Sequence, residues 1–169
     1  MNFNQGDQVV HHTFGIGTVV SIEEMNMTGS EARMFYRIGF LNSTVWVPVD
    51  DTSKGKLRPI TPQGHLAQYR AVLQSAPVNL DSNFRKRQIE LEERLDKGSL
   101  QGLCEVIRDL DALDIEKPLS YSEKRLLKQT REALVVEWSA TGGLTHNEAL
   151  SEINGCLDKG RKGSNDNDA

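Results

Sequence analysis

The hydrophobic pattern of this chain changes its period once, at a proline-containing connector, and this change constrains the fold more than any other feature. Before residue 57 the apolar residues alternate with polar ones over short stretches, whereas after Pro62 they recur every three or four positions. Alternation is typical of strands with one buried face, and the longer spacing is typical of amphipathic helices. We therefore expect two domains of different class, joined through residues 57–62.

The first domain is predicted to be a β domain. Its apolar segments are short, rich in β-branched and aromatic residues and separated by turn residues, and they occupy residues 8–11, 15–24, 34–40 and 44–49. Four or five strands of this length bury a common face when their sheet closes on itself. We expect residues 1–62 to form a small antiparallel β-barrel of the Tudor or SH3 type.

The second domain is predicted to be all-α. A first apolar stripe, which ends before Pro77, consists of Leu66, Tyr69, Val72 and Leu73. Asp81 or Ser82 is expected to open the next helix and Ser99 to cap a third, while capping-box patterns at 120–123 and 145–148 predict two more. The predicted fold class is therefore α+β with two domains. The helical domain has about five helices over residues 63–158, and residues 159–169 form a flexible polar tail.

Composition narrows the functional class. Charged residues make up 26% of the chain, and no apolar run approaches the roughly 20 residues that span a bilayer. The first residues have neither the basic start nor the apolar stretch of a signal peptide, so we expect a cytoplasmic protein with no membrane partner. The two cysteines are expected to be free thiols, with Cys104 buried inside a helical pattern.

The chain also lacks the motifs that carry common chemistry. No Walker loop, GxSxG elbow or paired-cysteine zinc pattern occurs, and Gly15-Ile16-Gly17 is best read as the start of a tight hairpin. His11 and His12 are neighbours on a predicted strand, so their side chains point to opposite faces and cannot share a metal. We expect no catalytic residue, no metal, no cofactor and no small-molecule substrate.

Residues 6–11 and 14–17 form one recognisable segment of the first domain, and residues 44–49 and 57–59 form another. They resemble the opening and the end of the N-terminal domain of the CarD/CdnL family of bacterial transcription regulators, and the same opening occurs in transcription-repair coupling factors. The helical domain of the family resembles, in order and spacing, residues 83–87, 98–99, 106–110, 119–127 and 131–135. The resemblance covers about residues 3–140, and the helicase motor of the repair factors does not follow.

This resemblance implies a function in transcription initiation. The barrel would bind the β subunit of RNA polymerase, and the helical domain would contact promoter DNA at the upstream edge of the bubble. Neither contact reads a DNA sequence, and together they would favour the open complex.

The polymerase contact implied by the family is the addition of a strand to an exposed sheet edge. The hairpin of residues 34–40 and 44–49 is the candidate, and its expected polymerase-binding residues are Arg37, Thr44, Trp46 and Pro48. Trp46 falls on the same strand face as Thr44 and Pro48, which favours an interface role over the alternative of a barrel-core residue.

The DNA contact is expected from two clusters. Phe84, where the family usually has Trp, is followed by Arg85, Lys86 and Arg87, so a ring would wedge into an unstacked minor-groove step beside cations that neutralise phosphates. The alternative places Phe84 in the core against Leu91. The second cluster has no acidic residue within it and consists of Lys124, Arg125, Lys128 and Arg131.

The net charge of −4 means that such clusters bind DNA weakly unless the barrel holds the protein on polymerase. A competing hypothesis is a Tudor- or SH3-like adaptor for another protein, which would need neither Phe84 nor the basic helix face. A remote third hypothesis is an enzyme in which Asp50, Asp51 and His11 meet at the barrel rim.

Overall fold

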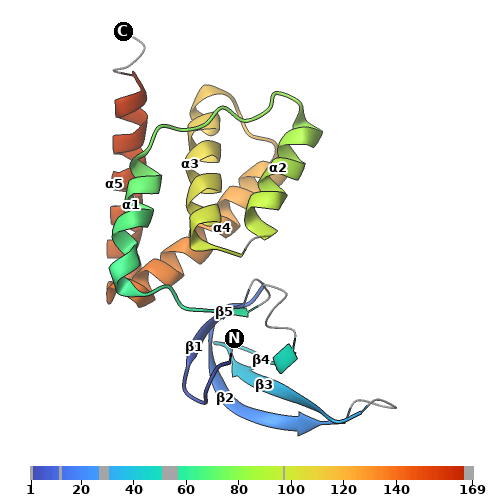
Figure 1. The fold of residues 1–169 in the computed structure, drawn as a ribbon. Coiled ribbons are helices and arrows are strands. Elements are labelled where there is room, and N and C mark those ends of the chain that lie inside the picture. The colour runs from blue at the N-terminus through green and yellow to red at the C-terminus, as the bar shows by residue number, and fades with distance from the viewer. Residues whose placement is uncertain (1, 12, 27–30, 51–56, 97, 166–169) are drawn as a thin grey trace. The chain divides into compact units, whose positions relative to one another are not determined.

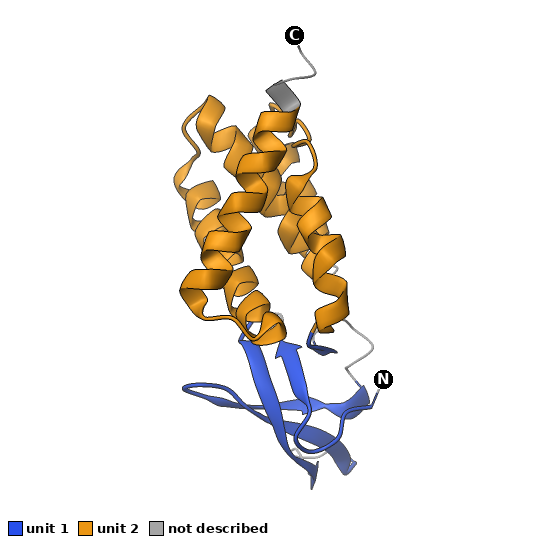
Figure 2. Cartoon of the chain, turned by 90° about the vertical axis from the view of Figure 1, so that its left-hand side faces the viewer, with its two compact units in different colours: residues 1–60 blue, residues 61–169 orange. Residues whose placement is uncertain are grey.

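A computed structural model provides the structure of the protein. It describes residues 2–11, 13–26, 31–50, 57–96 and 98–165, with side chains up to residue 163. Within these residues the elements follow the order of five strands, a short 3-10 helix and five α-helices (Figure 1). The chain divides into two compact units, residues 1–60 and 61–169 (Figure 2). The predicted fold class, an antiparallel β domain followed by a helical domain, is confirmed.

Unit 1 is an antiparallel sheet in the strand order β4-β3-β2-β1-β5. Its strands are β1 (Gln8–His11), β2 (Gly15–Met25), β3 (Arg33–Gly39), β4 (Thr44–Pro48) and β5 (Leu57–Pro59). Phe3, which precedes β1, and one residue or more from each strand form the core of this unit: Val9, Val19, Tyr36, Ile38, Val47 and Leu57. In this strand order, β4 lies at one edge of the sheet and β5 at the other.

The hairpin between β1 and β2 is fixed by a glycine and a histidine. Gly15 opens β2 with φ = +74°, a backbone conformation that glycine adopts without strain. His11 is buried, and its Nδ1 accepts hydrogen bonds from the backbone N–H groups of Thr13 (3.1 Å) and Phe14 (3.4 Å). The expected tight hairpin start at Gly15 is confirmed.

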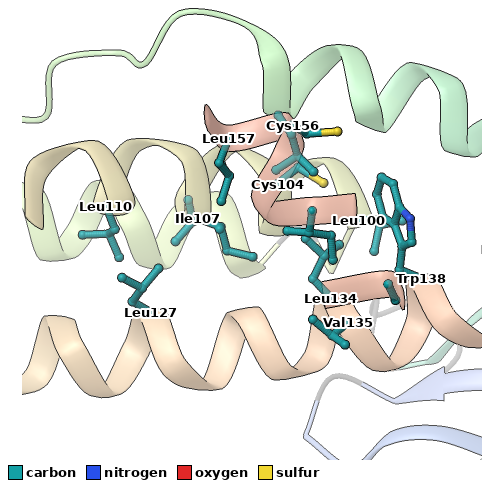
Figure 3. Close-up of a cluster of buried hydrophobic side chains, with 14 of the residues drawn as sticks. Leu100, Cys104, Ile107, Leu110, Leu127, Leu134, Val135, Trp138, Cys156 and Leu157 are labelled. Atoms are coloured by element: carbon teal, nitrogen blue, oxygen red, sulfur yellow. The ribbon is translucent and has the colours of Figure 1, made fainter. Parts of the chain in front are cut away.

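Unit 2 is a helical bundle with its own core. After the 3-10 turn η2 (Gln63–His65), its helices are α1 (Leu66–Gln74), α2 (Phe84–Asp96), α3 (Leu100–Glu116), α4 (Tyr121–Gly142) and α5 (His146–Asn165). Large apolar side chains fill the space between α3, α4 and α5, among them Ile107, Leu134 and Trp138 (Figure 3). Cys104 and Cys156 are free and belong to this core, and burial raises the pKa of the Cys104 thiol.

The helix starts follow the local sequence signals closely. Ser99 caps α3 by accepting from the Gly102 N–H, and Ser120 and Glu123 form a reciprocal capping box at α4. One start differs from the prediction. The side chain of Asn83, not of Asp81 or Ser82, caps α2 by accepting from Arg85 N–H (3.0 Å) and Lys86 N–H (3.2 Å).

The polar C-terminal segment also differs from the prediction. We expected a flexible tail from residue 159, but α5 continues to Asn165. Gly160 is buried where α5 packs closely against the end of α1, and an added Cβ there would lie 2.9 Å from the carbonyl oxygens of both Leu73 and Ser75. Arg161 pairs with Asp111 of α3 and with Asp158, so ion pairs extend the helix beyond its apolar stripe.

A buried carboxylate joins α2 to α3. Asp109 is 1% exposed and accepts from Arg94 of α2 (2.7 Å), from the neighbouring Arg108 (2.7 Å) and from the Val78 N–H (2.9 Å). At the other end of the same contact, Gly102 lies so close to α2 that a Cβ would be 2.3 Å from the Arg94 carbonyl oxygen. These contacts fix α2 on the bundle.

Candidate interaction surfaces

A polar and aromatic cluster lies on one face of strands β2, β3 and β4. Ser21 pairs with Arg37 across β2 and β3, and Arg37 pairs with Trp46 across β3 and β4, so their side chains share a face. The Arg37 guanidinium lies 5.9 Å from the centroid of the Trp46 ring and 3.6 Å from the Glu23 carboxylate. The Trp46 indole N–H donates to the second Glu23 oxygen at 3.3 Å.

We call these four residues, Ser21, Glu23, Arg37 and Trp46, the sheet-face cluster. Hydrogen bonds from Ser21 and Trp46, followed by the charge of Arg37, hold the pKa of Glu23 below its ordinary value. Trp46 remains 40% exposed and is absent from the barrel core, so its alternative role as a core residue is wrong. Thr44 is exposed and Pro48 is half-buried on the same edge strand. The four predicted polymerase-binding residues thus lie together on β3 and β4.

The first turn of α2 presents an aromatic ring and two cations. Phe84 is 44% exposed and is not part of the buried core that contains Leu91, so the core alternative for Phe84 is also wrong. Arg85 and Lys86 are exposed and form no ion pair with another described residue. The turn therefore exposes one ring and two positive charges that pair with none of the described acidic side chains.

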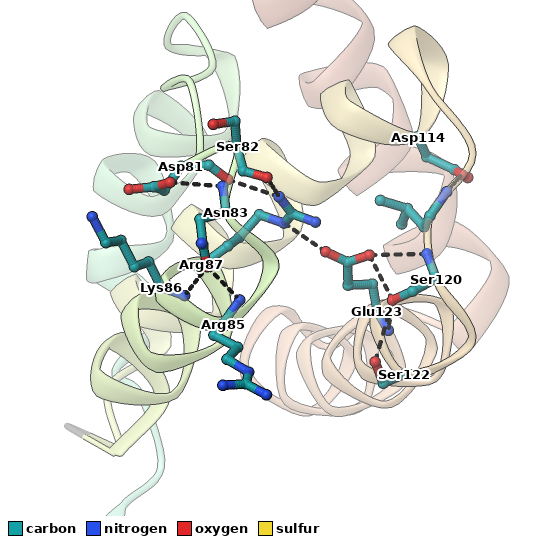
Figure 4. Close-up of polar contacts among 11 residues, drawn as sticks. Asp81, Ser82, Asn83, Arg85, Lys86, Arg87, Asp114, Ser120, Ser122 and Glu123 are labelled. Carbon is teal, nitrogen blue, oxygen red and sulfur yellow. Dashed lines mark hydrogen bonds and ion pairs between the residues drawn. The ribbon is translucent and has the colours of Figure 1, made fainter.

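Arg87 has a different role from the one predicted. Its side chain is buried, and its Nε donates to Glu123 Oε1 of α4 at 2.6 Å (Figure 4). Its Nη1 donates to the backbone carbonyls of Asp81 (2.7 Å) and Ser82 (3.3 Å). The guanidinium also lies 5.8 Å from the Phe84 ring centroid. Because these contacts bury the charge, Arg87 is not available to a DNA phosphate, and the prediction that it contacts DNA is wrong.

The second basic cluster lies on α4. Lys124, Lys128 and Arg131 line a shallow groove of about 350 Å³ together with Leu150 of α5 and other residues of α3, α4 and α5. Lys124 and Lys128 are exposed without an ion pair to another described residue, whereas Arg131 is held by Asp111 (3.0 Å) and by Asn154. Arg125 is exposed outside the groove. No α2 residue lines the groove, so the two predicted DNA clusters do not share it.

The described residues offer no centre for metal chemistry. No group of three His, Cys, Asp or Glu side chains among them could hold a metal ion. His12 and Asp51, two residues of the weaker hypotheses above, lie outside the described residues. Over the described helices, none has the length and apolar character needed to cross a membrane.

Comparison with known proteins assigns the two units. A family model described as "CarD-like/TRCF RID domain" matches residues 3–61, and one described as "CarD, C-terminal domain" matches residues 68–154. The two matches follow the division of the chain into units. The chain belongs to the CarD family. The predicted relationship to this family, and of the N-terminal domain to that of transcription-repair coupling factors, is confirmed.

Members of the CarD family are transcription factors, and this chain is a transcription regulator that interacts with RNA polymerase. A relative from Bacillus subtilis (strain 168), named "Putative transcription factor YdeB", is 28% identical over 151 residues. The aligned region covers 88% of this chain and 98% of the relative. The similarity therefore includes both units.

Two site residues were missed from the sequence. Glu23 contacts Arg37 and Trp46, which lie 14 and 23 residues later in the chain. From the sequence, only the alternation of β2 indicated on which face of the sheet its side chain lies. Glu123 was visible as a capping-box residue, but its partner Arg87 lies 36 residues earlier. No local pattern encodes either pairing.

Proposed function

We propose that this CarD-family regulator anchors on the β subunit of RNA polymerase through the β4 edge of unit 1. Its helical unit would then contact promoter DNA at the upstream edge of the bubble and stabilise the open complex without reading sequence. The observation that carries the proposal is an edge strand with a half-exposed Trp46 held by Arg37 and Glu23.

The polymerase contact is supported by backbone and side-chain features of β4. An edge strand presents main-chain N–H and C=O groups that pair with an added strand, and such pairing tolerates changes of sequence. Trp46 and Arg37 supply the specificity, since aromatic and arginine side chains dominate binding energy at protein interfaces. Glu23 fixes both in place before binding, which lowers the entropy cost of association.

The DNA contact is supported by Phe84 with Arg85 and Lys86 in the first turn of α2 and by Lys124, Arg125 and Lys128 on α4. An exposed ring next to unpaired cations suits a step in DNA that has lost its stacking. Arg131, whose charge is shared with Asp111, contributes less. The protein would act where polymerase meets the promoter, in the cytoplasm at the nucleoid.

Tethering reconciles this role with a net charge of −4. A few phosphate contacts give weak and salt-sensitive affinity for free duplex. Anchoring unit 1 on polymerase raises the effective concentration of unit 2 at the bubble edge to the order of millimolar. The two contacts are therefore expected to work only together.

Calorimetry with the full chain and the isolated β-subunit lobe of a bacterial RNA polymerase tests the anchor. We expect binding by the wild type, at least about tenfold weaker binding by Trp46→Ala and by Arg37→Glu, as for loss of an interface hot spot, and unchanged binding by Phe84→Ala. Equal affinity of all four proteins would contradict the proposed surface. Absence of binding by the folded wild type would favour the adaptor hypothesis.

A further inference from the structure

We propose that Arg87 and Glu123 are positioning residues that hold the Phe84 ring in the orientation in which it meets DNA. This inference rests on the proposed function, because it assigns a device to the same site. It gives the buried ion pair between α2 and α4 a role beyond joining two helices.

The contacts of Arg87 leave its guanidinium little freedom. One nitrogen faces Glu123, and another faces the carbonyls of Asp81 and Ser82, which precede the α2 cap. The group is thereby fixed between the start of α2 and the start of α4 (Figure 4). A planar guanidinium held by several acceptors is pre-organised in a way that a flexible ammonium is not.

The contacts of Glu123 are equally complete. Its Oε1 accepts from Arg87, while its Oε2 accepts from the Ser120 N–H (2.9 Å) and the Ser120 hydroxyl (2.6 Å). The carboxylate therefore closes the capping box of α4 and binds α2 at the same time. Because both oxygens are used, a shift of the α2 start relative to α4 would break one set of bonds.

Among the described side chains that contact Arg87, the Glu123 carboxylate is buried, whereas the Phe84 ring is half-exposed. The guanidinium lies within cation–π range of Phe84, and that ring is still 44% exposed. A buried ion pair adds little net stability compared with apolar packing, since desolvation offsets its attraction. The ion pair instead fixes the orientation of the Phe84 ring. Arg87 lies against one face of the ring, and the rest of the ring stays exposed to a partner.

The test is a double-mutant cycle on the full chain, read out as the lifetime of a polymerase–promoter open complex well below the unfolding temperature. The variants are Phe84→Ala, Glu123→Gln and their combination, with Arg87→Lys as a second probe of the pair. Gln keeps a capping-box acceptor and nearly the same shape, so the fold is expected to survive. Glu152→Gln, which removes the partner of Arg70 in a half-exposed ion pair elsewhere in unit 2, is the matched control.

We expect Glu123→Gln and Arg87→Lys each to shorten the lifetime by about two- to fivefold, the range of a cation–π contact, and Glu152→Gln to leave it unchanged. In the Phe84→Ala background, Glu123→Gln should have no further effect, since the ring that it positions is gone. In NMR spectra, we expect the Arg87 Nε–H of the wild type to exchange slowly with solvent because it is buried against Glu123, and faster exchange in Glu123→Gln would report the broken pair directly.

The outcomes separate the two claims. If Phe84→Ala leaves the lifetime unchanged, the proposed DNA contact itself is wrong. If Phe84→Ala shortens the lifetime, but Glu123→Gln has no effect or an effect that simply adds to it, the positioning role is wrong while the proposed function stands.

Discussion

Glu123 is the residue whose ionisation is tied most closely to the structure. Burial disfavours its charged form, but hydrogen bonds from Ser120 and Arg87 outweigh that cost and hold the pKa of Glu123 below its ordinary value. Because the folded pKa is the lower one, the stabilisation is complete above the ordinary pKa and is lost as the pH falls through the folded value. Arg87 then remains buried beside a neutral acid.

The charge of Glu123 is therefore expected to make a contribution to the free energy of unfolding that is lost in acid, and the substitution Glu123→Gln should remove it. Urea unfolding should show the variant to be less stable than the wild type by about 1–3 kcal/mol near neutral pH, the penalty for disturbing a buried charged hydrogen bond. The difference in free energy of unfolding should shrink as the pH falls below the ordinary pKa of a glutamate, about 4.3, and should vanish once the pH is below the lower folded pKa, where the wild-type carboxylate is neutral as well. A difference independent of pH would show that the charge of Glu123 is not what stabilises the pair.

The site residues could be predicted from the sequence only in part. Trp46 could be placed on the Thr44 and Pro48 face from strand alternation alone, and the structure leaves it half-exposed there. Arg87 could not be separated from Arg85 and Lys86, because three adjacent cations look equivalent until a partner on another helix is known. Burial of a charge depends on long-range contacts that the local pattern does not contain.

At the scale of elements, the contact between α2 and α3 depends on a glycine. Gly102→Ala would place a Cβ 2.3 Å from the Arg94 carbonyl oxygen, and a backbone atom cannot swing aside as a side chain does. We expect destabilisation by about 1–3 kcal/mol from overpacking, even though alanine favours helix.

Gly155 on α5 provides the control for this substitution. A Cβ at Gly155 would meet nothing within 4 Å, so Gly155→Ala should stabilise the protein by up to about 1 kcal/mol through helix propensity. Thermal or urea unfolding of the two variants measures both signs. A neutral or stabilising Gly102→Ala would mean that α2 does not pack against α3 as described.

Most helices and strands could be predicted from the sequence, because residues close in the chain determine where each of them begins. Ser99, the 120–123 capping box and the glycine of the first hairpin are local signals, and all three act as expected. The end of α5 was not readable, because a polar stretch predicts a tail unless its distant partner is known. Arg161 finds that partner in Asp111, fifty residues earlier.

At the scale of the whole molecule, the proposed mechanism assigns polymerase binding to unit 1 and DNA contact to unit 2. Unit 1 carries an edge strand with an aromatic and charged face, and unit 2 carries an exposed ring and exposed cations without an ion pair in the described part of the chain. The proposed mechanism needs both on one chain, because the charge of unit 2 is too small for strong binding to free DNA. The change of hydrophobic period predicted the two units, and the contacts proposed for each of them come from the family resemblance.

The lifetime of open complexes formed by RNA polymerase with this protein, after challenge with a competitor, tests the central claim most directly. The account predicts that the wild type lengthens the lifetime and that Arg37→Glu abolishes this effect through loss of binding. Phe84→Ala should also abolish or strongly reduce it while still binding polymerase. Full activity of an Arg37→Glu protein that no longer binds the β subunit would contradict the account, because the helical unit would then act without its anchor.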